Sequence, residues 1–282
     1  MGTVHGVYLK YVGMSALSYV GYSLLSGDDD SSSASSTNAT NSMLRLMFGY
    51  STVVNGMIAV LFKTERGMAI IGKDKQKGTI PLWSYVVFFP FHLPTILYTH
   101  VHTRTSKYNT KLQKQKDEND IEYEKKKTSK PVYEIVPVAS EVQPGWWVGG
   151  CYGHELRNQT SWGGIIDLTV EFPESCRSQT KHYLSAPTWD GVPLSPEDLE
   201  HAATFAVNSR KDGDVLVHCA HGRGRSTTVM CACLVKAGLF DNWLQAFEVG
   251  IKPYRPVCKL NARMRQNLTS WQSQYVDGKK GS

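Results

Sequence analysis

One cysteine, Cys219, lies among residues whose types and spacing could carry out phosphate chemistry. It follows the apolar stretch 215–217, and Arg225 and Ser226 come six and seven positions after it. A thiolate is a strong nucleophile, and a guanidinium can hold two oxygens of a phosphoryl group in a bidentate fork. The spacing therefore predicts a nucleophile seated beside an anion-binding loop.

The residues after Cys219 predict a cradle for a phosphate. Two glycines let the backbone curl until consecutive N–H groups converge, and the helix predicted from about Arg225 onward points its dipole at the same place. This field should lower the thiol pKa below its reference value of about 8.5. The predicted phosphate-binding loop consists of Ala220, His221, Gly222, Arg223, Gly224 and Arg225.

If the thiolate displaces an alcohol from a phosphate ester, the departing oxygen needs a proton. Asp190, which lies in a loop bounded by glycine and proline, is the predicted donor. Asp167 falls inside an apolar strand, where a structural role is expected. Asp212 and Asp214 come too close before the strand to reach over the loop. Ser226 can donate a hydrogen bond to the Cys219 sulfur, which would help that sulfur to depart from a phosphoryl group bound to it.

Strands and helices alternate around this loop, and that alternation predicts an α/β domain over 131–282. A mostly parallel central sheet flanked by helices is expected, with the phosphate loop at the carboxyl end of a strand. Ser195 and Pro196 open a well-signalled helix. Strands are predicted near 146–150, 164–169, 181–184 and 215–217, and helices near 196–210, 225–237, 241–251 and 258–275.

The sequence His-Cys-x-x-Gly-x-x-Arg-Ser after an apolar strand resembles the signature of the cysteine-based protein tyrosine phosphatase superfamily, and the short domain resembles its dual-specificity branch. The resemblance covers roughly 131–275, including the turn 252–256 and the loop 186–193 that carries Asp190. It implies hydrolysis through a phosphocysteine on Cys219, with Arg225, Asp190 and Ser226 as the other catalytic residues. No cofactor is implied.

The six cysteines have no metal-ligand spacing, so no metal site is expected, and a thiolate nucleophile needs a reducing compartment, which argues against disulfides. The net charge of +6 suggests anionic partners or a membrane surface.

The region 1–103 differs in character and is predicted to associate with a membrane. Residues 46–62 carry no charge and are nearly long enough to span a bilayer. A second uncharged stretch, 80–101, is interrupted by two prolines, and a weaker apolar run covers 11–25. A charged linker is predicted over 104–130.

Charge also predicts an orientation for this region. Residues 26–42 are acidic and carry one glycosylation sequon at Asn38, which suits a lumenal side. Loop 63–79 has five basic residues, and 102–130 has nine against five acids, so both favour the cytosol. Both can lie there only if 80–101 is a re-entrant or interfacial hairpin. The catalytic domain is then expected to face the cytosol.

Three functions remain open on the sequence. The first is a membrane-anchored phosphatase for phosphotyrosine, phosphoserine or phosphothreonine in proteins. The second is a phosphoinositide or other phospholipid phosphatase, which the extra basic residues His221 and Arg223 would suit. The third is a catalytically silent phosphate-binding module. A resemblance to RNA triphosphatases is faint, and no nucleic-acid partner is expected.

Overall fold

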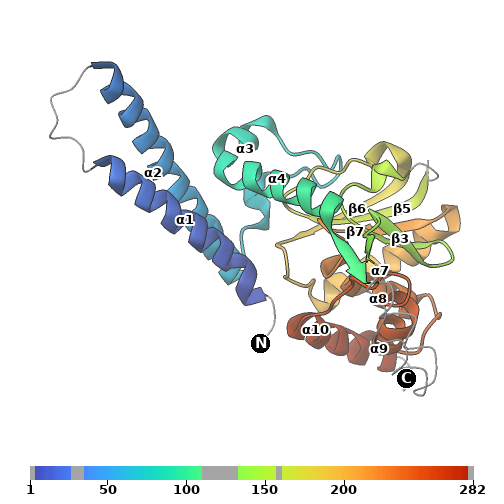
Figure 1. The fold of residues 1–282 in the computed structure, drawn as a ribbon. Coiled ribbons are helices and arrows are strands. Elements are labelled where there is room, and N and C mark those ends of the chain that lie inside the picture. The colour runs from blue at the N-terminus through green and yellow to red at the C-terminus, as the bar shows by residue number, and fades with distance from the viewer. Residues whose placement is uncertain (1–3, 27–34, 110–132, 157–160, 279–282) are drawn as a thin grey trace, which may run out of the picture.

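The computed structural model describes residues 4–26, 35–109, 133–156 and 161–278, and it has a helical part and an α/β part (Figure 1). Most of the predicted linker 104–130 lies outside the described residues. The helical part begins with a hairpin of α1 (Val4–Ser26) and α2 (Ser35–Thr64). Since α2 begins at Ser35, the sequon at Asn38 lies in its first turns and not in the predicted loop.

The apolar stretch 80–101 forms two helices, α3 (Leu82–Val87) and α4 (Phe89–Thr105), separated at Phe88. Pro90 fits the first turn of α4, where its missing N–H costs no helical hydrogen bond. Among the described helices, one segment, Ala39–Thr64 of α2, is long and apolar enough to cross a bilayer. The predicted segment 46–62 lies inside it, and 11–25 lies inside α1.

The central sheet has the strand order β3-β4-β7-β5-β6. Its central pairings, β4–β7, β7–β5 and β5–β6, are parallel, as predicted, while β3 pairs antiparallel with β4 at one edge. The sheet is therefore mixed, because β3 and β4 form a hairpin. The strands are β3 (Ala139–Gln143), β4 (Trp146–Gly149), β5 (Trp162–Thr169), β6 (Thr180–Thr188) and β7 (Val215–His218).

The helices of this domain follow the predicted order. Helix α7 (Pro196–Ser209) begins after Ser195, whose hydroxyl caps the N–H of Asp198. Helix α8 (Arg225–Lys236) follows the loop after β7, and the residues of α8 and β7 are almost all buried. The remaining helices are α9 (Trp243–Gln245), continued as a π-helix over Ala246–Ile251, and α10 (Ala262–Gln272), continued as a π-helix over Ser273–Asp277.

The two parts share hydrophobic contacts. Phe62 of α2 and Phe91 of α4 form one buried cluster with Val170, Trp189 and Val192 of the α/β domain. A small antiparallel pair, β1 (Lys107–Asn109) with β2 (Tyr133–Ile135), joins the end of α4 to the start of that domain. The helical part is therefore packed against the loops at the carboxyl end of the sheet.

Candidate active site

Cys219 is buried where β7 ends, and its Sγ lies 3.4 Å from the hydroxyl oxygen of Ser226 at the start of α8. Burial alone would raise the pKa of this thiol. The Arg225 guanidinium, the Ser226 hydroxyl and the backbone N–H groups of Ser226 and Arg223 outweigh burial, and the thiol pKa is lowered from 9.0. The other buried cysteines with a resolved shift have raised pKa values instead: Cys151, Cys176, Cys231, Cys233 and Cys258.

Arg225 is fully enclosed and oriented by several acceptors. Its Nη2 donates to Glu171 Oε1 at 2.6 Å, and its Nη1 donates to the carbonyl oxygens of Thr188 at 2.6 Å and Leu168 at 3.0 Å. Its Nε is buried and has no hydrogen-bond partner among the described residues. Burying an N–H donor without a hydrogen-bond partner costs free energy, so a bound oxyanion that accepts from this Nε would be stabilised.

Asp190 lies on the loop after β6, and its Oδ1 is 3.5 Å from Arg225 Nη2. Its side chain is 44% exposed, in contrast to that of Arg225 at 2%. The structure thus places Cys219, Ser226, Arg225 and Asp190 around one point.

The neighbour of Asp190, Trp189, fixes this loop to the helical part. Its ring stacks on Phe62 with centroids 4.4 Å apart and meets the edge of Phe91 at 6.1 Å. Its Nε1 donates to the carbonyl oxygen of Arg66 at 2.8 Å. Trp189 is completely buried by these contacts, so the position of Asp190 depends on α2 and α4.

Glu171 is a site residue that the sequence did not reveal. It follows β5 closely, so it lies at the same edge of the sheet as Cys219, where the carboxyl ends of parallel strands meet. Its two carboxylate oxygens both accept from Arg225. An acidic residue just beyond a predicted parallel strand is the one signal that could have identified it.

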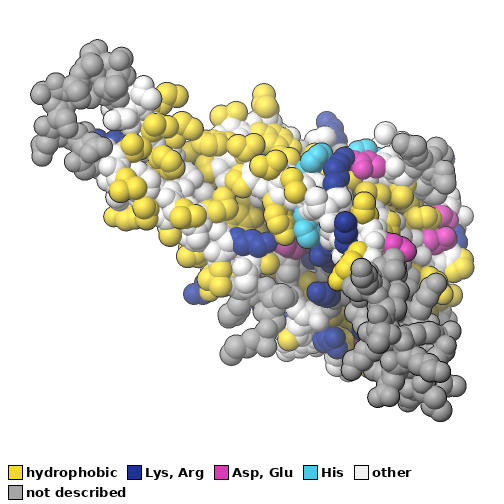
Figure 2. Space-filling model, in the orientation of Figure 1, with side chains coloured by type: hydrophobic (Ala, Val, Ile, Leu, Met, Phe, Trp, Pro, Cys, Tyr) yellow, Lys and Arg dark blue, Asp and Glu magenta, His cyan; other side chains and the backbone are white. Residues whose placement is uncertain are grey.

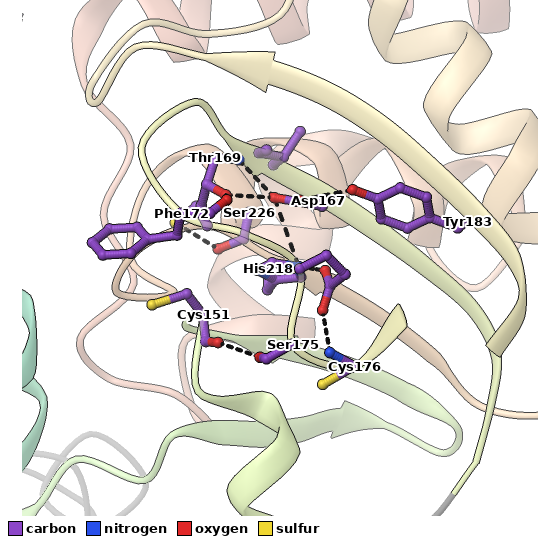
Figure 3. A network of polar contacts seen from close by, with 12 residues as sticks. Cys151, Asp167, Thr169, Phe172, Ser175, Cys176, Tyr183, His218 and Ser226 are labelled. Carbon is purple, nitrogen blue, oxygen red and sulfur yellow. Dashed lines mark hydrogen bonds and ion pairs between the residues drawn. The ribbon is translucent and has the colours of Figure 1, made fainter. Parts of the chain in front are cut away.

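A buried polar network lies behind the loop (Figure 3). Lys73, from the loop before α3, donates to Asp167 and, at 2.8 Å, to the carbonyl and hydroxyl oxygens of Thr169. Asp167 also accepts from the Tyr183 hydroxyl at 2.9 Å. His218, which directly precedes Cys219, lies with its Nε2 2.5 Å from Glu174 Oε2.

The charges of this network balance one another. Burial would lower the pKa of His218, but Glu174 and Asp167 outweigh it and raise the pKa to about 9. Burial would raise the pKa of Asp167, but Lys73 and His218 hold it below its usual value. Asp167, Glu174 and His218 lie close enough to share a metal ion, yet the Lys73 ammonium already serves as the cation beside Asp167.

His221 and Arg223, the extra basic residues of the loop, are engaged by the helical part. Arg223 donates to the Ser106 hydroxyl, and the His221 ring packs edge-on to His102 with centroids 4.7 Å apart. Burial, together with the neighbouring His102 and Arg223, lowers the pKa of His221 to about 3. His221 is therefore neutral and adds no charge to the cradle.

Gly222 and Arg255 set the shape of the outer loop. Gly222 has φ of 64°, and a Cβ there would lie 2.5 Å from the backbone of Gly149. Arg255 is buried and donates to the carbonyl oxygens of Gly222 at 2.8 Å and His221 at 3.2 Å. Holding these carbonyls outward leaves the loop N–H groups to face inward.

The site opens into a cavity of about 200 Å³. Ala220, His221, Glu171 and Asp190 line it on the catalytic side, and residues of α1, α2 and α4 line the other side.

No family model matches the chain. Over 115 residues it is 34% identical to mouse dual specificity protein phosphatase 14, which covers 39% of this chain and 55% of the relative. The chain thus spans about half the length of that curated relative.

Solved phosphatase structures are similar to about half of this chain. Human DUSP28 is 20% identical, with 49% of this chain and 95% of that chain covered and a TM-score of 0.43. PTPMT1 in complex with PI(5)P is 18% identical, with 49% and 96% covered and a TM-score of 0.41. In its signature loop and in its match to the mouse relative, the chain is similar to the dual-specificity branch of the cysteine-based protein tyrosine phosphatase superfamily.

Proposed function

We propose that this chain is a membrane-associated phosphatase that hydrolyses phosphate monoesters through a phosphocysteine on Cys219. The observation that carries the proposal is the pairing of a buried thiol of lowered pKa with Arg225, whose buried Nε is unpaired among the described residues. A silent binding module would need the arginine and the loop but not an activated nucleophile.

In the first step the Cys219 thiolate attacks phosphorus opposite the leaving oxygen. The S–P bond forms as the P–O bond to the alcohol breaks, and Asp190 donates its proton to that oxygen. Arg225 and the loop N–H groups hold the equatorial oxygens, whose charge grows in the transition state.

In the second step a water molecule attacks phosphorus and gives its proton to the Asp190 carboxylate. The S–P bond breaks, inorganic phosphate leaves, and the thiolate returns. Ser226, with its oxygen 3.4 Å from Sγ, can donate its proton toward the sulfur and stabilise the departing thiolate.

Membrane association is supported by the apolar surface of the helical part. Hydrophobic side chains cover the hairpin and the adjoining α3 and α4, while Lys, Arg and His side chains gather where these helices meet the α/β domain (Figure 2). The outermost include Leu17, Leu24, Leu46, Val53, Leu82 and Val86, each more than half exposed. A bilayer would cover such a surface, and the basic boundary favours the cytosolic face for the catalytic domain.

For the substrate, phosphotyrosine, phosphoserine or phosphothreonine in a protein fits the name of the mouse relative. A phospholipid needs the same chemistry at Cys219. The surfaces beside the phosphate-binding loop decide between phosphoprotein and phospholipid substrates, because the loop itself contacts only the phosphoryl group.

The proposal is tested on the full chain in detergent micelles with para-nitrophenyl phosphate. Wild type should release nitrophenol, Cys219→Ser should abolish release, and Asp190→Ala should accumulate a cysteine-linked phosphate that mass spectrometry locates on Cys219. Cys233→Ser is the matched control, because that buried thiol lies within α8 and has a raised pKa. Retained turnover in Cys219→Ser would contradict the mechanism.

A further inference from the structure

The cavity at the catalytic loop has walls of two different kinds. On one side are the polar groups of the site. On the other side the helical part contributes apolar side chains and, among them, the polar groups of Lys10, Tyr11, Thr95, Tyr98 and Thr99. The apolar side chains are Val7 and Met14 of α1, Phe62 of α2, and Phe91 and Pro94 of α4. An alcohol leaving from phosphorus must therefore lie against these helices.

The same helices that form the wall carry the exposed apolar surface described above. Leu9 and Val12 of α1 and Leu93 and Leu97 of α4 are exposed on the helices whose other residues line the cavity. Apolar side chains therefore lie on both the cavity side and the outer side of α1 and α4. This arrangement is expected of a site that receives its substrate from within a bilayer.

Charge in the cavity limits the headgroup. Among the described residues that line it, Lys10 is the one side chain with a permanent positive charge, and its Nζ lies 4.7 Å from the centre of the Tyr98 ring. His221 is held neutral. Arg223 is directed to Ser106 and, with Arg255, lines a small neighbouring pocket that shares His221 with the cavity. Within the cavity itself, a headgroup with several phosphates would meet Lys10 as the one permanent positive charge among the described lining residues.

We propose that the substrate is a glycerolipid phosphate monoester without a sugar ring, of which phosphatidic acid is the simplest example. It enters laterally, with its phosphate in the Cys219 loop and an acyl chain along α1 and α4. This substrate class rests on the proposed function. It narrows the expectation that His221 and Arg223 suit a phosphoinositide or other phospholipid.

Lys10 is then a substrate-binding residue at the headgroup. Its ammonium lies at the boundary between the apolar wall and the loop, where it can pair with a phosphate or ester oxygen of a lipid. A small soluble ester such as para-nitrophenyl phosphate is too short to use the apolar wall.

The test compares phosphate release by the full chain in phosphatidylcholine vesicles that contain phosphatidic acid, phosphatidylinositol 5-phosphate or phosphatidylinositol 4,5-bisphosphate, and from phosphotyrosine and phosphothreonine peptides. We expect kcat/KM for phosphatidic acid to exceed the others by at least about tenfold, as apolar-pocket contacts typically give. Comparing kcat/KM for phosphatidic acid in vesicles with kcat/KM for its short-chain soluble analogue separates the contribution of acyl-chain contacts from that of headgroup contacts.

Two variants test the cavity itself. Lys10→Gln and Val7→Trp should each lower the ratio of phosphatidic acid turnover to nitrophenyl phosphate turnover by about tenfold, the first through charge and the second by filling the cavity. Lys63→Gln is the control, because Lys63 lies on the same hairpin but lines a different groove. It should leave the ratio unchanged.

The outcomes separate the two proposals. If nitrophenyl phosphate is hydrolysed but peptides or polyphosphoinositides are the better substrates, or if Val7→Trp leaves the ratio unchanged, the lipid assignment is wrong and the phosphatase stands. If Cys219→Ser retains turnover of every substrate, the proposed function itself is wrong.

Discussion

At the scale of single residues, Arg225 is oriented before any phosphate binds. Glu171 holds both ends of its guanidinium, and carbonyl oxygens of Leu168 and Thr188 hold Nη1. Fixing a guanidinium in advance removes the cost of ordering it in the transition state. Glu171 is thus proposed as a positioning residue.

Glu171→Gln should lower kcat about 10- to 100-fold with a smaller change in KM, since an amide accepts only one strong bond from the guanidinium. Steady-state kinetics with para-nitrophenyl phosphate measure this. Glu155→Gln, which weakens a more exposed pair with Arg104, is the control and should have no effect. Equal rates for both variants would show that the backbone acceptors alone orient Arg225.

Asp190→Ala should lower turnover of an alkyl phosphate by about 10²–10⁴-fold, because an alkoxide needs a proton to leave. The loss should be smaller for para-nitrophenyl phosphate, whose leaving group is stable without one. A plot of rate against leaving-group pKa measures the difference. An identical slope in the variant and wild type would remove Asp190 from the mechanism.

The sequence predicted this part of the site well for a physical reason. Cys219, Arg225 and Ser226 are neighbours along the chain, so their spacing alone fixes their geometry once a strand and a helix flank them. Glu171 and Arg255 reach the loop from other elements, and no local pattern encodes that. The sequence left open whether His221 adds positive charge to the loop, because its burial against α4 was not visible there.

At the scale of elements, the loop with Asp190 is fixed by contacts from the helical part. Trp189→Phe keeps the ring on Phe62 but loses the hydrogen bond to the Arg66 carbonyl oxygen. It should reduce alkyl phosphate turnover several-fold and leave aryl phosphate turnover nearly unchanged, because it displaces the acid and not the nucleophile.

Trp147→Phe is the matched control, because its indole N–H bonds Asp214 in another part of the domain. A uniform loss on both substrates by Trp189→Phe would indicate general destabilisation instead of displacement of the acid.

Lys73 links the loop before α3 to the interior of the sheet. Lys73→Met should cost about 3–5 kcal/mol of unfolding free energy, since it leaves the Asp167 carboxylate buried without its cation. Adding Asp167→Asn should recover part of the loss. Chemical denaturation measures both, with Lys75→Met as the exposed control. An additive double variant would mean that the pair does not interact.

The pH dependence of stability follows from His218. Its pKa is raised from 6.5 to about 9, so its contribution is fully present below pH 6.5 and is lost as pH rises through about 9. Unfolding free energy should fall by roughly 1–3 kcal/mol over that range. Denaturation is best followed in Cys219→Ser, which removes the opposite titration of the thiol, and His218→Gln should flatten the curve.

The elements themselves were largely predictable. Apolar runs located β5 and β7, and the Ser-Pro start located α7. The antiparallel edge strand β3 was missed because its alternating residues, Ala139–Gln143, are too short a signal beside the turn. Interruptions were expected at Pro90 and Pro94. The break lies at Phe88, just before Pro90, whereas Pro94 lies inside α4 and does not end it. No local signal predicted that the helices on either side of the break would pack against the α/β domain.

At the scale of the whole molecule, the helical part contributes residues to the interior and to the active site of the α/β domain. It provides Lys73 to the buried network, Phe62 and Phe91 to Trp189, and one wall of the cavity. Loop 63–79 and the end of α4 both contact the α/β domain, through Lys73 with Asp167 and Arg104 with Glu155.

A fragment that begins at Pro131 should therefore be unstable, although its domain boundary follows from composition. It would expose Trp189 and leave Asp167 without Lys73, a combined loss of several kcal/mol against a total of about 5–15 kcal/mol. Comparing its thermal denaturation with that of the full chain measures the effect. Equal stability would assign the helical part to anchoring alone.

The contact between Lys73 and Asp167 spans 94 residues, and its first partner is synthesised well before its second. On the proposed membrane association, the helices would enter the bilayer while the sheet is still being made, and the domain would fold onto a lysine already in place. A molecule whose helices failed to insert would lack that template. Only molecules inserted in the membrane would then fold stably and be active. Molecules that failed to insert would unfold and be degraded before they could hydrolyse phosphate esters elsewhere in the cell.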